Sequence, residues 1–99
     1  MEYFEGTKGK WEVVHNSFVN DVKCEDATIA TVFNNGGLSA GEANAQLISA
    51  APELLDAALS AWVLLSDIPE EFMDDFNKKV VRELDSSISK ALGYKIGKK

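Results

Sequence analysis

Reactive side chains are scarce in this 99-residue chain, which has one cysteine, Cys24, one histidine, His15, and one arginine, Arg82. A lone cysteine forms no internal disulfide and completes no zinc site by itself, so covalent and metal staples are excluded. Stability has to come from packing, with assembly into a homo-oligomer as a second source. We expect no catalytic residues, no metal site and no cofactor.

Long apolar runs and phosphate-binding motifs are also absent. No apolar stretch approaches the ~20 residues that cross a bilayer, and the first residues lack the basic region and apolar core of a signal peptide. Neither G-x-G-x-x-G nor G-x-x-x-x-G-K-[ST] occurs, so Gly36-Gly37 indicates only a turn. We therefore expect a cytoplasmic protein without a membrane partner.

Positive charge is the third shortage. Ten Lys and Arg residues stand against 16 Asp and Glu residues, which gives a net charge of −6. Phosphate backbones are bound through cations that displace counterions, so direct binding of duplex nucleic acid is not expected. An acidic protein can instead bind a basic protein surface, including one built for nucleic acid. Solubility is the simpler explanation of the same charge.

The apolar pattern predicts a single α+β domain over residues 1–99, beginning with a three-stranded antiparallel sheet at about residues 11–33. β-branched and aromatic residues fill three short runs there, separated by turn residues. We expect two or three helices packed on one face of this sheet. Alternation groups the side chains able to cover a helical layer: Trp11 with Val13, Phe18 with Val22, and Ile29 with Thr31 and Phe33.

The three helices are expected at about residues 40–50, 52–65 and 69–92. Ser39 and Glu42 have the spacing of a capping box, and Pro52 suits the first turn of the second helix. Asp67 is expected to cap the third helix, with Pro69 in its first turn. Gly93 follows as a stop signal. The apolar seam of this helix recurs every three or four residues, at Met73, Phe76, Val80, Leu84 and Ile88.

Five carboxylates gather near the predicted start of the last helix, and we call them the acidic cluster: Asp67, Glu70, Glu71, Asp74 and Asp75. The helix dipole favours acidic side chains there, so capping and solubility explain them without a partner. The acidic cluster is nevertheless the best local candidate for a surface that binds a basic protein.

Lys78, Lys79 and Arg82 follow as the candidate site for an anion or a nucleotide. Three cations on one helix flank are able to hold a phosphate, and arginine offers a bidentate fork. The simpler interpretation is intrahelical pairing, because Asp74–Lys78 and Asp75–Lys79 both have the i, i+4 spacing with the acid first. The spacing favours pairing over a phosphate site.

His15, Cys24 and the large aromatic residues have structural explanations. A turn histidine and a half-buried strand cysteine account for the first two, and a catalytic pair across the second strand is the weaker alternative. The aromatic residues lack surrounding Lys and Arg, so base stacking is not expected. We assign them to the core between sheet and helices: Trp11, Phe18, Phe33 and Trp62.

A resemblance to phage proteins rests on residues 41–55, which read GEANAQLISAAPELL. This stretch is similar to a signature of small proteins from tailed phages and prophages, commonly E-A-N-A-x-L-I-x-A-A-P-E-L-L, preceded by a tryptophan and a strand resembling residues 29–32. The resemblance covers about residues 9–62. Lys10 departs from it, because relatives often have proline before the tryptophan. Residues 66–99 lie outside the signature, so we expect this member's own activity in the last helix.

The resemblance also implies a function. Small dispensable phage proteins often act on the host, and acidic ones often inhibit defence or nucleic-acid-handling enzymes by occupying a basic site. This implies a non-enzymatic accessory protein that binds and inhibits such a host protein through the acidic cluster. One alternative is an oligomeric sponge that sequesters a cyclic nucleotide immune signal through Lys78, Lys79 or Arg82. A structural or assembly protein of the phage is the other.

Overall fold

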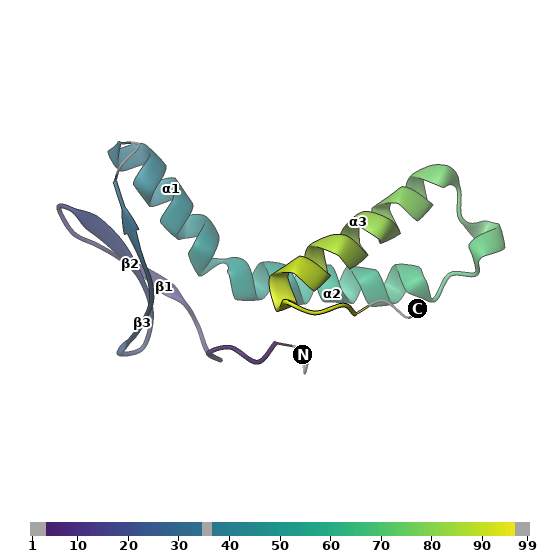
Figure 1. Ribbon diagram of the computed structural model, residues 1–99, viewed down its shortest axis with the longest axis horizontal. Helices are drawn as coiled ribbons and strands as arrows, with labels where there is room; N and C mark the ends of the chain where they lie inside the picture. Colours follow the sequence, from purple (N-terminus) through teal and green to yellow (C-terminus); the bar gives the residue numbers. More distant parts are fainter. Residues whose placement is uncertain (1–3, 35–36, 97–99) are drawn as a thin grey trace. The chain divides into compact units, whose positions relative to one another are not determined.

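The computed structural model describes residues 4–34 and 37–96. Three strands come first and the helices follow (Figure 1). The strands are β1 (Glu12–His15), β2 (Val19–Cys24) and β3 (Ala27–Phe33). The helices are α1 (Leu38–Ser49), α2 (Ala51–Ser66), the short 3₁₀ helix η1 (Glu70–Phe72) and α3 (Asp75–Leu92). The predicted fold class is confirmed: the protein is α+β, with an N-terminal three-stranded antiparallel sheet followed by helices.

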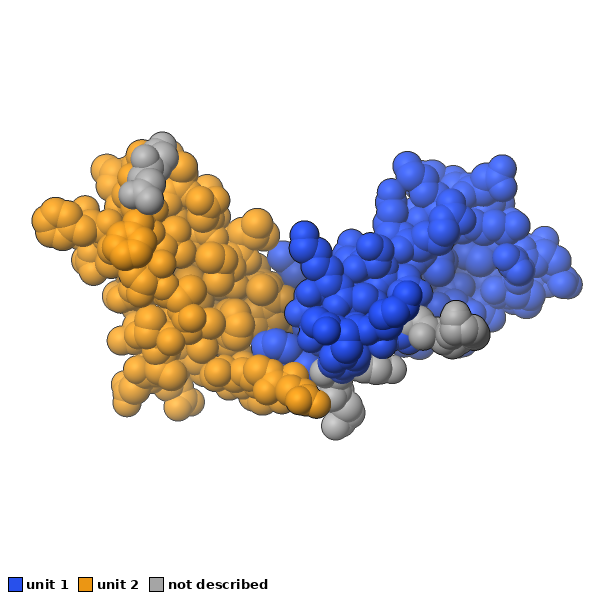
Figure 2. All heavy atoms as spheres, in the orientation of Figure 1, with its two compact units in different colours: residues 1–4, 53–99 blue, residues 5–52 orange. Residues whose placement is uncertain are grey.

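The chain's own contacts divide it into two compact units (Figure 2). Residues 5–52 form the sheet unit, which contains the three strands and α1. The helical unit contains Phe4 and, of the chain that follows, the described residues 53–96, with most of α2 and all of α3. The single domain expected for residues 1–99 stays a prediction.

The sheet has the order β1-β2-β3, and both neighbouring pairs are antiparallel. The first hairpin is closed by Asn16, whose side-chain oxygen accepts hydrogen bonds from the backbone N–H groups of Phe18 and Val19, both at 2.9 Å. Asparagine is suited to this role because its short side chain imitates a backbone turn. Glu25 makes the second turn with a φ of 54°. Local turn chemistry thus accounts for the meander.

The core of the sheet unit lies on one face of β2, where Asn20, Val22 and Cys24 are buried in alternation. α1 covers the sheet and contacts all three strands. Gly41 and Ala45 are its buried residues. A Cβ atom at Gly41 would clash with the side chain of Asn34 and lie 3.2 Å from Asn20 Nδ2. Glycine therefore permits the close approach of helix and sheet.

The predicted grouping of side chains is wrong for β3. Val22 pairs with Ala30 and Asn20 pairs with Val32, so Ala30 and Val32 share the buried face. Phe33, which pairs with Val19, lies on the opposite face and is exposed. Because side chains alternate with a period of two, a shift of one residue in register exchanges the two faces of a strand. The sequence pattern did not identify that register.

The aromatic assignment to a common core is also wrong in part. Phe18, at the first hairpin, is 81% exposed. Trp11 precedes β1, and its indole Nε1–H donates to the carbonyl oxygen of Thr7 at 3.2 Å. Trp62 is half-buried on α2, in the helical unit. Small residues fill the interface between α1 and the sheet instead, because a helix at such close range leaves no room for large rings.

α1 starts without the predicted capping box. Gly37 is its N-cap, with a φ of 104° and no side-chain hydrogen bond, and Ser39 and Glu42 lie inside the helix. Glycine adopts this positive φ at no steric cost, so the chain enters the helix before Ser39. The predicted break is confirmed, because α1 ends at Ser49 and Pro52 stands in the first turn of α2. No described helix is by itself long and apolar enough to cross a membrane, and α1 and α2 pass that test only as a pair.

The last helix begins at Asp75, later than the predicted residue 69. Its cap is Asp74, whose carboxylate accepts a hydrogen bond from the backbone N–H of Asn77 at 2.8 Å. Asp67 therefore does not cap this helix. Pro69 has extended geometry, with a φ of −58° and a ψ of 142°. Asp74 satisfies a free amide of the first turn, which explains why the helix starts there.

The face that α3 buries differs from the predicted seam. Phe76 is 68% exposed and Ile88 is 1% exposed. Each residue turns the helix by about 100°. Phe76 and Ile88 are twelve positions apart, so their side chains point in directions about 120° apart around the helix axis. Val81 and Leu84 lie nearer to the direction of Ile88 and are half-buried. The seam is wrong at Phe76, and also at Met73, which precedes the helix in extended geometry.

Candidate functional site

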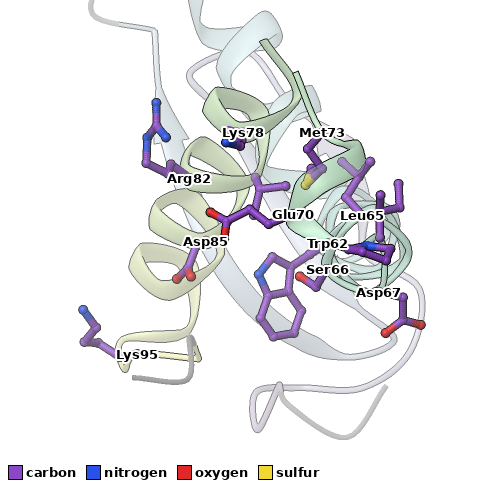
Figure 3. A pocket seen from close by; sticks show the side chains of 13 residues that line it. Trp62, Leu65, Ser66, Asp67, Glu70, Met73, Lys78, Arg82, Asp85 and Lys95 are labelled. Atoms are coloured by element: carbon purple, nitrogen blue, oxygen red, sulfur yellow. The ribbon is translucent and has the colours of Figure 1, made fainter. Parts of the chain in front are cut away.

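An open cleft of about 980 Å³ lies in the helical unit, between α2, the connecting segment and α3 (Figure 3). Part of its lining is apolar and comes from Trp62, Leu65, Ile68, Met73 and Val81. The charged lining consists of three cations and three acids, Lys78, Arg82, Lys95, Asp67, Glu70 and Asp85. The cleft therefore combines an apolar wall with six charged side chains, which are the two kinds of contact that a small molecule can use.

α3 supplies one wall of the cleft through helical spacing. Lys78, Val81, Arg82 and Asp85 follow one another at three, one and three residues and all line the cleft. Residues three or four apart are neighbours on a helix surface, so the two cations stand one turn apart. The sequence predicted a basic group here, but it did not predict the wall opposite, where Trp62 contributes from α2.

Lys95 reaches the cleft because the chain turns at the end of α3. Gly93 ends the helix with a φ of 85°, as predicted. The backbone N–H of Ile96 then donates to Ser89 Oγ at 3.3 Å, and this hydroxyl donates to a carboxylate oxygen of Asp85 at 3.5 Å. These two hydrogen bonds tie the segment after Gly93 to α3 and also engage one of the three acids of the cleft.

The predicted intrahelical ion pairs are not formed. Asp74 caps the helix, and Lys79 pairs with Glu83 at 3.7 Å, which is also an i, i+4 neighbour. Lys78 and Arg82 form no ion pair with any described residue, although both line the cleft. The structure therefore separates the three predicted cations. Two belong to the cleft, and Lys79 belongs to a surface ion pair.

All five residues of the acidic cluster are exposed. Two phenylalanines stand among them in the chain, Phe72 at 72% exposure and Phe76 at 68%. The sequence interpretation missed both, because Phe76 fitted the apolar seam and Phe72 lay inside the helix predicted at about residues 69–92 without a role of its own. The available signal was the alternation of acids and aromatics in EEFMDDF, residues 70–76. We call residues 67–76 the acidic–aromatic segment.

His15, the last residue of β1, and Cys24, the last residue of β2, lie at opposite ends of the β1–β2 hairpin. His15 is the cross-strand partner of Asn20, and Cys24 ends the strand. The four residues from Asn20 to Cys24 span about 13 Å at a rise of about 3.3 Å per residue. Cys24 Sγ contacts the carbonyl oxygen of Lys8 at 3.4 Å. The catalytic Cys–His pair held as an alternative is therefore wrong.

A directed chain of hydrogen bonds explains what His15 does instead. Asn34 Nδ2 donates to the carbonyl oxygen of Phe18 at 3.3 Å, and Asn20 Nδ2 donates to Asn34 Oδ1 at 2.9 Å. Asn20 Oδ1, 2.6 Å from His15 Nδ1, is left as an acceptor. Because a carbonyl only accepts, the direction of the chain requires a proton on His15 Nδ1. This histidine satisfies a buried amide that is 1% exposed.

Metal binding finds no support in the described part of the chain, where no group of three His, Cys, Asp or Glu side chains is placed to hold an ion. The acidic cluster is spread along a turn, a 3₁₀ helix and the start of α3. Its carboxylates therefore form a charged surface and do not converge on one point.

Comparison with protein-family models identifies a bacteriophage protein, with a match over residues 1–95. The chain belongs to the family described as Salmonella phage P22 protein Y8K6. This confirms the phage resemblance, whereas the signature at residues 41–55 stays a prediction. The match extends past the signature and includes α3, so this helix is part of what the family model covers. No curated protein and no solved structure matches the chain.

Proposed function

We propose that this phage protein is a non-enzymatic accessory protein that binds and inhibits a host protein through the acidic–aromatic segment. The partner is a defence or nucleic-acid-handling protein with a basic surface. The observation that carries the proposal is the exposure of Phe72 and Phe76 among five exposed carboxylates. Large rings in water lack the free energy that burial would give them, and a partner that covers these two rings would gain it.

The arrangement has the composition of a protein interface. Interfaces place aromatic anchors at the centre and charged groups at the rim, and a few anchors supply most of the binding free energy. None of the five carboxylates forms an ion pair with a described residue, so their charge is available to a partner. Asp74 accepts one hydrogen bond from the backbone N–H of Asn77. Negative rim charges select a basic partner and speed its encounter.

The test is capture of host proteins on the tagged full-length chain, followed by an activity assay of the captured protein. A double variant, Phe72→Ser with Phe76→Ser, removes the two anchors and leaves every charge in place. The matched control is Phe18→Ser with Phe33→Ser, which removes two exposed rings from the sheet unit. Circular dichroism checks that each variant is folded.

We expect a basic host protein to be captured at low salt, released as salt screens the charges, and inhibited when bound. The Phe72/Phe76 variant loses capture and inhibition by about tenfold or more, as is typical of anchor residues. The Phe18/Phe33 variant retains both. Capture that is equally strong for the two variants, or the failure to capture any host protein at low salt, contradicts the proposal.

A further inference from the structure

The cleft of the helical unit is separate from the two aromatic anchors, because neither Phe72 nor Phe76 lines it. From its lining we infer that this cleft binds a nucleotide, with the base on Trp62 and the phosphate on Lys78 and Arg82. A cleft of about 980 Å³ lies within the range of ligand sites, about 300–1,000 Å³. Figure 3 shows the indole of Trp62 in the cleft, with Arg82, Asp85 and Lys95 on the side of α3 and the segment after it.

The apolar part of the lining suits an aromatic ring. Trp62 is half-buried and is accompanied by Leu65 and Ile68 from the same side and by Val81 from α3. A nucleobase is flat and polarizable, so it gains from stacking on an indole as well as from leaving water. A simple inorganic anion would leave this surface uncovered. The sequence pattern did not lead us to expect base stacking, because it placed no cations near Trp62, whereas Lys78 and Arg82 line the same cleft in the structure. The apolar lining therefore favours a ligand with an aromatic ring.

The positive charge of the cleft suits a phosphate, with Lys78 and Arg82 as the pair that would hold it. Lys78 and Arg82 stand one turn apart on α3, and Lys95 is brought to the same cleft by the turn at Gly93. None of the three forms an ion pair with a described residue, so their charges are not already neutralised at short range. Arg82 offers the fork geometry that matches two phosphate oxygens, and Lys78 adds a point charge.

The acids in the same cleft favour a small nucleotide over a nucleic-acid strand. Asp67 and Glu70 lie on the connecting segment, and Asp85 already accepts a hydrogen bond from Ser89. Carboxylates repel an extended polyanion, so a nucleic-acid strand is disfavoured. They do accept hydrogen bonds from the amino group of a base or from ribose hydroxyls. A single nucleotide, with donors at one end and phosphate at the other, satisfies both sets of charges.

The experiment uses the fluorescence of Trp62 in the full chain. Trp11 is the other tryptophan, so the measurements are made in a Trp11→Phe background. AMP, cyclic 3′,5′-AMP, adenosine and inorganic phosphate are titrated separately. The indole N–H signal of Trp62 in the ¹H–¹⁵N spectrum of the unsubstituted chain gives a second measurement that does not depend on the background substitution.

We expect saturable changes in both signals with AMP or cyclic AMP, and binding weaker by about tenfold or more for adenosine and for phosphate, since each lacks half of the contacts. The relative affinities of AMP and cyclic AMP then identify the form of phosphate that the cleft prefers. Lys78→Gln with Arg82→Gln weakens nucleotide binding by about tenfold or more.

The matched control is Lys79→Gln, which removes a cation of the same helix that pairs with Glu83 and does not line the cleft. We expect this variant to bind nucleotide as the parent does. Two results overturn the inference: no saturable change with either nucleotide at millimolar concentration, or an equal loss of affinity in Lys79→Gln, which would show attraction to the general charge of the helix.

Discussion

The sheet unit and the helical unit differ in how many side chains they bury and in how closely their elements pack. In the sheet unit, α1 lies close against the strands through Gly41 and Ala45, and even a buried polar group, Asn20, has its hydrogen bonds satisfied. In the helical unit, the fully buried side chains of the described residues are Leu59 and Ile88. The comparison teaches that the unit with fewer fully buried side chains is the one that carries the cleft and the acidic–aromatic segment.

This difference has a physical reason. A strand pair satisfies its backbone groups with its neighbours, so a sheet with one helix over it closes a core with small side chains. Two helices joined by a segment with little regular structure satisfy their backbone groups internally and leave space between side chains. In this protein, the cleft occupies the space between the side chains of α2 and α3. Phe72 lies on the connecting segment and is exposed.

The largest expected effect is on the sparse core of the helical unit. Leu59→Ala removes a side chain that is fully buried and should lower the free energy of unfolding by about 2–5 kcal/mol. Leu64→Ala, in the same helix at 68% exposure, is the matched control and should change it by less than about 0.5 kcal/mol. Urea unfolding followed by circular dichroism measures both. Equal losses for the two variants would show that α2 does not bury the face that carries Leu59.

The next effect concerns the close contact in the sheet unit. At an exposed helix position, Gly→Ala stabilises a protein by about 1 kcal/mol. At Gly41 the new methyl group would meet the side chains of Asn34 and Asn20, which are hydrogen-bonded to each other. We therefore expect the free energy of unfolding to fall by about 1–3 kcal/mol. The sign of the change in urea unfolding is the decisive result. A more stable Gly41→Ala variant would contradict the packing of α1 on the strands.

The smallest effect tests where the last helix begins. Asp74→Ala removes the side chain that caps α3 and should cost about 1 kcal/mol. Asp67→Ala removes the same charge from the turn after α2 and should change the free energy of unfolding by less than about 0.5 kcal/mol. Thermal unfolding of the two variants under the same conditions compares them directly. The reverse order would place the cap at Asp67, where the sequence pattern predicts it.

Much of the fold follows from local signals. Runs of β-branched residues mark the strands, Pro52 marks the start of α2, and Gly93 marks the end of α3. Each signal acts through backbone geometry within a few residues of itself, which is why it can be recognised without the rest of the molecule. The start of α3 shows where such reasoning weakens, because Asp67 and Asp74 are both good caps and only one is used.

The candidate site was less predictable. The acidic cluster and two cleft cations, Lys78 and Arg82, stand out in the sequence as charges at helical spacing. Trp62 and Lys95 join them only through the way α2, α3 and the turn at Gly93 are arranged. Contacts between residues so far apart in the chain depend on packing, for which the local pattern holds no signal.

The sequence by itself determined the strand and helix content, the breaks between elements, the negative charge and the shortage of reactive side chains, since these depend on residue type and on neighbours in the chain. Only the tertiary structure decided which strand face meets α1, that Phe76 is exposed, and which charges share a cleft. A period of two or of 3.6 specifies relative directions around an element, but the absolute direction is set by what the element packs against.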